Sequence, residues 1–280
     1  MKTGLVLEGG AMRGMYTAGV LDIFLDHNIT VDGVIGVSAG ALFGVNYLSQ
    51  QRGRTIRYNK RFNRDKHYLG LHSLIHTGNI VNTDLAYGTV PRKLDPFDDK
   101  AFMASGIPFY AGITSIKTGT AKYVKINSVF EQMDVLRASA SMPFVSTPVN
   151  LNGHYYLDGA IADSIPYRKM FSMGYDNLIV ILTRDRSYQK TPMSKTLIKL
   201  FYGKHPAFAN TLYNRHKAYN NCLQELETLQ KTGNIFIIRP SRPINIGRIE
   251  KDPAKLQQVY DIGIHDGTAA IKKLQQFMTN

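Results

Sequence analysis

The sequence predicts an α/β protein with three layers, α/β/α, around a mainly parallel central sheet. Strands are expected over residues 4–10 and 32–37, and they alternate with helices over 14–28 and 39–51. Such alternation is typical of parallel strands that are joined by helices covering both faces of the sheet. The stretch NLIVILT at 177–183 is apolar almost throughout, as expected of a strand buried on both faces.

The remaining elements follow from the same periodicities. Two strands are expected to form a hairpin around the turn IKTG, because Gly119 can adopt a positive φ. A helix over 131–141 should end before Pro143. The further expected elements are strands at 108–115, 119–126 and 154–160, and helices at 207–230 and 269–278.

The domain organisation is expected to be simple. The chain has 280 residues, 44% of them hydrophobic, with no internal repeat or clear linker, so we expect one domain over 1–280. Residues 52–100 are basic and then polar, and are expected to form a helical insertion with loops at 76–82 and 90–99. A helical C-terminal extension is expected from about residue 186.

Composition argues against several classes of protein. Cys222 is the only cysteine, which excludes an internal disulfide and a cysteine-based metal site. His67, His72 and His76 lack neighbouring acids and are interpreted as surface residues, so no metal and no cofactor is expected. No apolar run approaches the roughly 20 residues of a membrane span, and Glu8 interrupts the only N-terminal candidate for a signal peptide. We therefore expect a cytoplasmic protein.

The net charge of +13 is concentrated in two segments. Residues 52–69 carry seven Lys and Arg against one acid, and residues 184–217 carry eight against one. Concentrated positive charge attracts phosphates, but neither segment contains a nucleic-acid-binding signature. We therefore expect peripheral contact with an anionic membrane and no binding of nucleic acid. A solvated basic face is the alternative.

The strongest chemical signal is the pattern G-x-S-x-G at residues 36–40, read as Gly36-Val37-Ser38-Ala39-Gly40. An apolar strand precedes it and a helix of small residues follows. A serine on such a strand-to-helix turn presents its hydroxyl to a substrate, and the flanking glycines let the neighbouring chain approach closely. Ser38 is therefore a candidate nucleophile.

A serine nucleophile needs a group that stabilises the oxyanion, and the turn EGGAMRG at residues 8–14 can supply it. Backbone amides at the start of a helix, unobstructed by side chains, are suited to that role. The loops after the first two parallel strands open at the same sheet edge, which would bring the amides of Gly10, Ala11 and Met12 near Ser38. A dinucleotide-binding loop fits poorly, because Ala11 interrupts G-x-G-x-x-G.

Two residues compete as the base for Ser38. His265 is the best-placed of the eight histidines, and would make a conventional triad. Asp158 ends an expected strand, and Gly159 leaves its carboxylate accessible in a tight turn. A partly desolvated carboxylate could take the serine proton directly. The pattern alone leaves both open.

Together these three motifs resemble the patatin-like phospholipase family, which combines a glycine-rich oxyanion loop, a G-x-S-x-G elbow and a D-G-G/A aspartate in that order. The resemblance runs from residue 4 to about residue 170 and continues into the strand at 177–183. It implies a Ser38–Asp158 dyad without histidine or metal that hydrolyses acyl esters of lipids. The supporting motif positions are Gly9, Arg13, Gly14, Gly36, Gly40 and Gly159.

The oxyanion loop departs from the family's pattern at one position and matches it at another. The family's third glycine is replaced by Ala11, whose methyl group is tolerable at negative φ and would narrow the hole. Arg13 matches the basic position of the family's loop, and is expected either to support an oxyanion or phosphate, or to be held by a nearby acid.

The expected function is a serine acyl hydrolase of the phospholipase A, lysophospholipase or esterase type, acting on a lipid or phospholipid ester. A thioesterase or acyltransferase with the same dyad, a Ser-His-Asp esterase using His265 and a non-catalytic lipid-binding protein remain as alternatives. Residues 193–202 are expected to form either an amphipathic cover over the site or a peripheral helix. The oligomeric state is left open.

Overall fold

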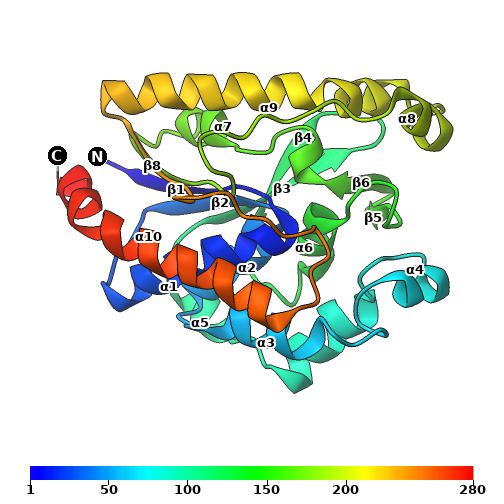
Figure 1. Cartoon of the computed structure of the whole chain (residues 1–280), viewed down its shortest axis with the longest axis horizontal. Helices are drawn as coiled ribbons and strands as arrows, with labels where there is room; N and C mark the ends of the chain where they lie inside the picture. The colour runs from blue at the N-terminus through cyan, green and yellow to red at the C-terminus, as the bar shows by residue number, and fades with distance from the viewer. Residues whose placement is uncertain (280) are drawn as a thin grey trace.

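The computed structural model describes residues 1–279 and contains one mixed sheet between layers of helices (Figure 1). The strand order is β5-β6-β3-β2-β1-β7-β8, and β4 pairs with β3. All pairings from β3 through β2, β1 and β7 to β8 are parallel, whereas those of β4, β5 and β6 are antiparallel. The strands are β1 (Thr3–Leu7), β2 (Gly33–Val37), β3 (Phe109–Ser115), β4 (Ala121–Ile126), β5 (Val149–Leu151), β6 (His154–Asp158), β7 (Asn177–Ile181) and β8 (Ile235–Ile238).

Helices cover both faces of this sheet, which confirms the predicted three-layer architecture. On one face lie α1 (Met15–Asp26), α2 (Ala39–Leu48) and α10 (Pro253–Thr279). On the other face lie α7 (Tyr167–Ser172) and α9 (Pro206–Thr232). The two longest helices, α9 and α10, therefore lie on opposite sides of the sheet (Figure 1). The remaining helices are α3 (Arg54–Phe62), α4 (Leu71–Thr77), α5 (Asp99–Ala104), α6 (Met133–Ala140) and α8 (Lys195–Tyr202).

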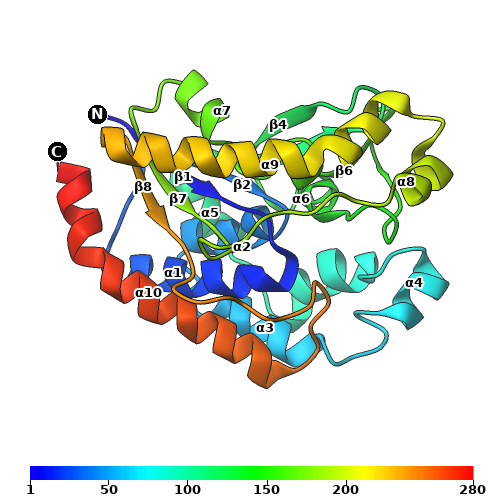
Figure 2. The same ribbon diagram turned by 45° about the horizontal axis from the view of Figure 1, so that its top comes forward.

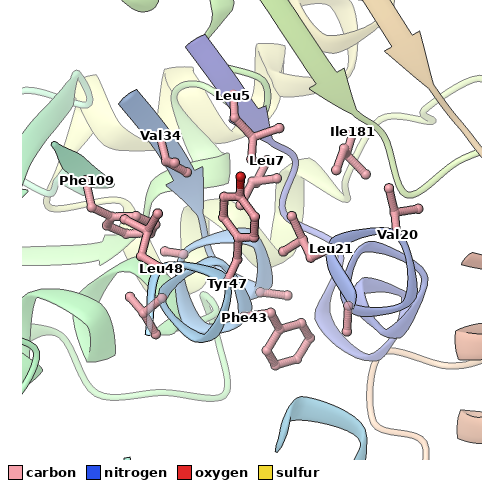
Figure 3. Close-up of a cluster of buried hydrophobic side chains, with 14 of the residues drawn as sticks. Leu5, Leu7, Val20, Leu21, Val34, Phe43, Tyr47, Leu48, Phe109 and Ile181 are labelled. Atoms are coloured by element: carbon pink, nitrogen blue, oxygen red, sulfur yellow. The ribbon is translucent and has the colours of Figure 1, made fainter. Parts of the chain in front are cut away.

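Alternation along the central strands explains why both faces are covered. Leu5 and Leu7 of β1 point into the cluster under α1 and α2, together with Phe109 and Ile181 (Figure 3). Val6, between the two leucines, belongs to the cluster on the α7 and α9 side. Successive residues of a strand face opposite sides of the sheet, so a strand that is apolar at every position needs helices on both.

The C-terminal helix α10 packs directly against α1. A Cβ on Gly19 would lie 2.3 Å from the carbonyl oxygen of Tyr260, and one on Gly263 would lie 2.1 Å from that of Tyr16. Glycine at both positions therefore lets the two backbones touch. The predicted helix at 269–278 is correct but too short, since α10 begins at Pro253.

Sheet register brings two strand ends together at one point. Along one edge of β3, β2 pairs in parallel up to Val37 opposite Gly112. β6 then pairs in the antiparallel direction along the same edge, and its last residue, Asp158, is opposite Ile113. The carboxyl ends of β2 and β6 thus meet head to head on β3. The residue after Val37 is Ser38.

Four helical segments lie within residues 54–104, and the expected loop at 90–99 is partly wrong. A π-helix, η2, spans Asp84–Leu94 and includes Pro91. Pro91 has no N–H to donate, so it contributes no hydrogen bond as a donor within this helix. The sequence pattern also missed β5, β8 and α7, which are only three to six residues long.

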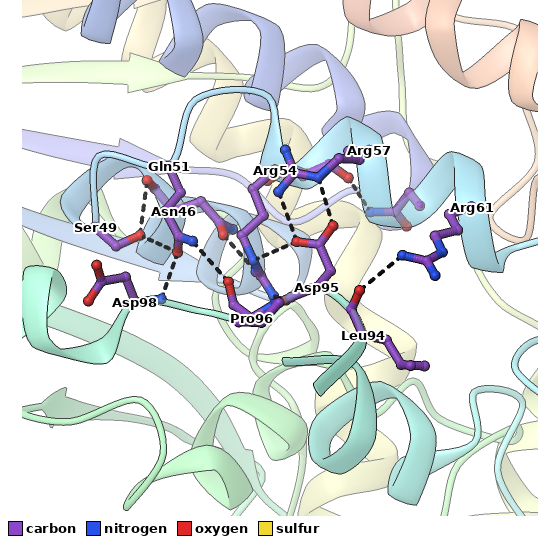
Figure 4. Close-up of polar contacts among 12 residues, drawn as sticks. Asn46, Ser49, Gln51, Arg54, Arg57, Arg61, Leu94, Asp95, Pro96 and Asp98 are labelled. Atoms are coloured by element: carbon purple, nitrogen blue, oxygen red, sulfur yellow. Dashed lines mark hydrogen bonds and ion pairs between the residues drawn. The ribbon is translucent and has the colours of Figure 1, made fainter. Parts of the chain in front are cut away.

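A buried ion pair fixes α3 against the segment after η2 (Figure 4). The Arg54 guanidinium lies 3.2 Å from the Asp95 carboxylate and donates to Asn46 Oδ1 at 2.8 Å. Arg57 pairs with the same carboxylate at 2.8 Å. Both Arg54 and Asp95 are 5% exposed, so this part of the basic segment 52–69 is interior. Desolvated charges of this kind persist only when paired.

Within residues 1–279, none of the helices combines the length and the apolar composition needed to cross a lipid bilayer.

Candidate active site

Ser38 occupies a strained turn between β2 and α2, as its motif predicted. Its backbone has φ 55° and ψ −125°, a conformation that side-chain-bearing residues rarely adopt. The turn is tight: a Cβ on Gly40 would lie 2.4 Å from the carbonyl oxygen of Leu7. The elbow therefore needs glycine at this position, and its geometry places the serine hydroxyl at the carboxyl edge of the sheet, where it lines two cavities.

A second serine holds the elbow in place. The backbone N–H of Ser38 donates to Ser139 Oγ at 2.9 Å, and Ser139 Oγ donates to the carbonyl of Gly112 at 2.7 Å. Ser139 thus ties α6 to both β2 and β3 at the strand ends. No sequence motif marks this residue. A small polar side chain in a helix otherwise facing the core was the only available signal.

Asp158 is the hydrogen-bond partner of Ser38. Ser38 Oγ donates to Asp158 Oδ2 at 2.7 Å, while Oδ1 accepts from the Ala160 N–H at 2.8 Å. Each of the two residues is 6% exposed. The head-to-head meeting of β2 and β6 on β3 creates this contact between residues 120 positions apart. Gly159 permits it, because a Cβ there would lie 2.1 Å from the carbonyl oxygen of Gly112.

The environment of Asp158 favours a carboxylate that can accept a proton. Burial raises the pKa of Asp158 above its usual value, since desolvation disfavours the charged form. The Arg215 guanidinium and the hydrogen bond from Ser38 oppose that rise. A base with a raised pKa takes a proton more readily than an ordinary surface carboxylate.

His265 lies elsewhere. It is on the exposed part of α10 and contacts the Asp266 carboxylate at 2.9 Å, with 77% of its side chain exposed. It belongs to neither cavity that Ser38 lines. Of the two bases left open by the sequence, the structure brings Asp158 to Ser38 and leaves His265 on the surface.

The glycine-rich loop passes beside Ser38. A Cβ on Gly9 would lie 2.9 Å from the Cβ of Ser38, so glycine is required for the close approach. A 3₁₀ turn, η1 (Ala11–Gly14), then leads into α1. Within residues 1–279, the amides of Gly10, Ala11 and Met12 donate to no protein acceptor. These are the donors that the motif indicated.

Ala11 departs from the condition set by its sequence. Its φ is +49°, in the left-handed region, rather than negative. This conformation costs an alanine about 1–2 kcal/mol relative to the right-handed region. The family's glycine at this position would adopt it without strain, so Ala11 retains the backbone path at a cost in stability.

Two cavities meet at Ser38. The acyl cavity, as we call it, has a volume of about 130 Å³ and is lined mainly by apolar side chains beneath α2, α3, η2 and α6. Its apolar lining includes Met12, Leu42, Phe43, Tyr58, Val90 and Leu136. The basic cavity has about 60 Å³ and is lined by Arg13, Arg184, Lys190, Arg215 and Arg248 together with Glu8 and Asp158. Ala11, Ser38, Met142 and Arg248 border both.

The basic cavity contains part of the positive charge that the sequence placed on an outer face. Arg184, Lys190 and Arg215 come from the basic segment 184–217, which was expected to form an outer face. They instead line the basic cavity beside Asp158, where each of the three is half-buried. Arg248, from the polar segment before α10, had no sequence signal at all.

Comparison with known proteins identifies the class. The family model described as patatin-like phospholipase matches residues 5–171, which include the glycine-rich loop, Ser38 and Asp158. The chain therefore belongs to the patatin-like phospholipase family and is a lipid ester hydrolase, as the three motifs predicted. A second model, a domain of unknown function called DUF6363, matches residues 205–279, which form α9, β8 and α10.

Individual relatives extend over most of the chain. An uncharacterized Escherichia coli protein, YjjU, is 27% identical over 94% of this chain and 75% of its own length. Lysophospholipase NTE1 of Scheffersomyces stipitis is 25% identical over 94% of this chain, and the neuropathy target esterase of Drosophila melanogaster is 26% identical over 85%. The chain spans only 17% of each of the latter two proteins.

Proposed function

We propose that this protein is a serine acyl hydrolase that cleaves lipid esters through a Ser38–Asp158 dyad. The observation that carries the proposal is the 2.7 Å hydrogen bond from Ser38 Oγ to the buried Asp158 carboxylate. That pair lies where an apolar cavity of about 130 Å³ opens beside it. A nucleophile with its base, next to space for a hydrocarbon chain, suits an enzyme that acts on acyl esters.

The proposed chemistry begins with proton transfer from Ser38 to Asp158. The serine oxygen attacks the ester carbonyl carbon, and the carbonyl oxygen becomes an oxyanion held by the amides of Gly10, Ala11 and Met12. The ester C–O bond then breaks, and Asp158 returns the proton to the leaving alcohol. Water, deprotonated by Asp158, hydrolyses the acyl-serine and regenerates both residues.

The acyl cavity supplies the binding energy for the chain. Its mainly apolar lining is suited to hold the hydrocarbon part of an acyl ester. Burial of each methylene contributes about 0.8 kcal/mol. A thioesterase or acyltransferase would use the same dyad and cavity, and differs in the leaving group and in the final acceptor.

Product analysis tests this proposal. The purified protein is incubated with a phospholipid and, separately, with an acyl-CoA of the same chain length, and released fatty acid and its partner product are measured by mass spectrometry. We expect free fatty acid from the lipid and little from the acyl-CoA. Faster release from the acyl-CoA would make the protein a thioesterase, and transfer to another lipid without free fatty acid would make it an acyltransferase.

One end of the molecule is suited to contact a membrane. In both views α4 and α8 lie at the same end (Figures 1 and 2). Each helix exposes large apolar side chains: Ile75 is 71% exposed on α4, and Leu200 is 76% exposed on α8. The exposed Lys195 and Lys199 on α8, with Lys204 after it, add positive charge. Apolar and basic side chains on one surface favour an anionic bilayer.

The lysines at this end are predicted to control vesicle binding. Replacing Lys195, Lys199 and Lys204 by Gln should weaken binding to vesicles containing phosphatidylglycerol by roughly 100-fold at low salt, at about 1 kcal/mol per residue. Hydrolysis of a small soluble ester should be unchanged. Vesicle sedimentation and the two hydrolysis rates measure both effects.

A matched triple variant controls for net charge. Lys231, Lys272 and Lys273 are exposed at the opposite end of the molecule, near the C-terminal ends of α9 and α10. Their replacement by Gln should leave vesicle binding nearly intact. Equal weakening by both triple variants would contradict a membrane-facing end at α8.

A further inference from the structure

The basic cavity contains more positive charge than the chemistry of a neutral ester requires. Five cationic side chains, Arg13, Arg184, Lys190, Arg215 and Arg248, line it together with two carboxylates, Glu8 and Asp158. The five come from four chain segments that are far apart in sequence: after β1, after β7, in α9 and before α10. A fold that gathers such residues into one small volume beside its nucleophile indicates an anionic ligand.

The two carboxylates offset only part of this charge, since five cationic groups face two acids and pair with neither. Within residues 1–279, none of the five cationic groups forms an ion pair. Glu8 instead accepts hydrogen bonds from the Thr183 N–H at 2.5 Å and from the Tyr219 hydroxyl at 2.6 Å. Asp158 is engaged by Ser38.

One of the cations has an unused donor. The Nε of Arg13 is buried and has no hydrogen-bond partner among the described residues. A buried donor left without a partner is unfavourable, and native proteins usually satisfy it with water or a ligand. Burial and neighbouring Arg184 lower the pKa of Arg13 to about 10. Burial and neighbouring Arg215 lower that of Lys190 to about 7. Both shifts reflect an excess of positive charge in a desolvated space.

The size and aromatic contacts of the cavity restrict the anion. Its volume of about 60 Å³ is enough for a phosphate group. A quaternary ammonium would need an open aromatic face. Here Arg184 already covers Tyr188 at 3.9 Å, and Lys190 covers Tyr219 at 4.1 Å. A choline group would therefore find no open aromatic face here, and the two cationic side chains would repel it.

We propose that the basic cavity binds the terminal phosphate of an anionic lipid, so that the enzyme prefers acyl esters of glycerol phosphate to zwitterionic phospholipids. This inference rests on the proposed function, since it assigns the headgroup side of the same site. A phosphomonoester carries close to two negative charges and offers three oxygens to guanidinium donors. In glycerol phosphate only a three-carbon backbone separates the ester from the phosphate, which matches a cavity bordering Ser38. In acyl-CoA the long pantetheine arm lies between them.

The test compares three substrates with one acyl chain: oleoyl lysophosphatidate, oleoyl lysophosphatidylcholine and uncharged monooleoylglycerol, each in neutral detergent micelles. Values of kcat/KM are measured for the wild type and for the Arg184→Gln/Lys190→Gln variant. We expect the wild type to prefer the phosphomonoester to the choline lipid by about tenfold or more. In the variant, the ratio of phosphomonoester to uncharged lipid should fall by about tenfold.

The control variant is Lys272→Gln/Lys273→Gln, which removes the same charge from an exposed part of α10. It should keep the wild-type ratio, and thermal melting of both variants checks folding. Inorganic phosphate, tested as an inhibitor of monooleoylglycerol hydrolysis, distinguishes the source of the anion. Inhibition by phosphate without preference for the phosphomonoester lipid would overturn the lipid assignment and identify a free-phosphate site.

Two other outcomes are separable. Equal kcat/KM values for the two lysophospholipids, with no effect of phosphate, would overturn the anion site while hydrolysis of monooleoylglycerol still supports the proposed function. Absence of hydrolysis on all three substrates would instead contradict the proposed function itself. Phosphate binding by the wild type and not by the double variant, measured by calorimetry, would then still support the anion site.

Discussion

Replacement of Ser38 by Ala is expected to abolish ester hydrolysis, with a loss of roughly 10⁴-fold or more in kcat. The change removes one oxygen, the proposed nucleophile, whose hydroxyl donates to Asp158 at 2.7 Å. The fold should survive because the backbone N–H that anchors the elbow to Ser139 is untouched. Alanine experiences the same strained φ as serine, so thermal melting should change little.

The matched control is Ser141→Ala. This serine lies just after α6 and its hydroxyl donates to the Arg137 carbonyl rather than to the dyad. It should retain most of the activity. Wild-type activity in purified Ser38→Ala would contradict the role of Ser38 as nucleophile, whatever the activity of the control.

Replacement of Asp158 by Asn is expected to lower kcat about as much as loss of the serine, by roughly 10⁴-fold. The amide can still accept the Ser38 hydrogen bond but cannot take its proton. His265→Gln should be nearly silent, since His265 is exposed on α10 and contacts Asp266. Loss of activity in the histidine variant with retention in Asp158→Asn would contradict the proposed base.

The pH profile gives this prediction a second readout. Asp158 acts as a base only when ionised, so wild-type kcat/KM should fall as the pH decreases through its pKa. Burial raises that pKa, and the acidic limb should therefore lie above the usual carboxyl value of 3.8. The residual activity of Asp158→Asn should lack this limb. An unchanged limb would assign it to another group.

The sequence predicted the turns at Ser38, at the glycine-rich loop and at Asp158 because the signals for them are local. The elbow at Ser38, the glycine-rich turn and the Asp-Gly turn are each set by steric needs within a few residues. The resemblance of these motifs to the family then favoured Asp158 over His265 as the base. The structure adds the reason for the contact, namely two strands that meet end to end on β3.

The basic cavity could not be predicted because its members are not local. Arg13, Arg184, Arg215 and Arg248 are brought together only by the packing of α9 and the segment before α10 over the sheet edge. In the sequence, their charges cannot be distinguished from those of exposed lysines such as Lys199. Segment charge therefore predicted an outer surface, whereas part of this charge lines the basic cavity beside Ser38.

Ala11 shows the same limit on a smaller scale. From the sequence, the methyl group of Ala11 is expected to require a negative φ. The path of the loop between β1 and η1 sets the angle instead, and φ is +49°. Short elements were missed for a related reason. The three-residue β5 has little pattern of its own and forms by pairing with β6, whereas β8 is apolar throughout but too short for its periodicity to distinguish a strand from a buried helix.

The most direct test of the dyad is covalent trapping by a fluorophosphonate, followed by mass spectrometry of the intact protein and of its peptides. We predict one adduct per chain, located on Ser38, because the reagent reacts with a serine whose proton is taken by a neighbouring base. Labelling of Asp158→Asn should be slower by orders of magnitude, and Ser38→Ala should not be labelled. An adduct on another residue, or an active wild-type enzyme that the reagent neither labels nor inhibits, would contradict the Ser38–Asp158 mechanism.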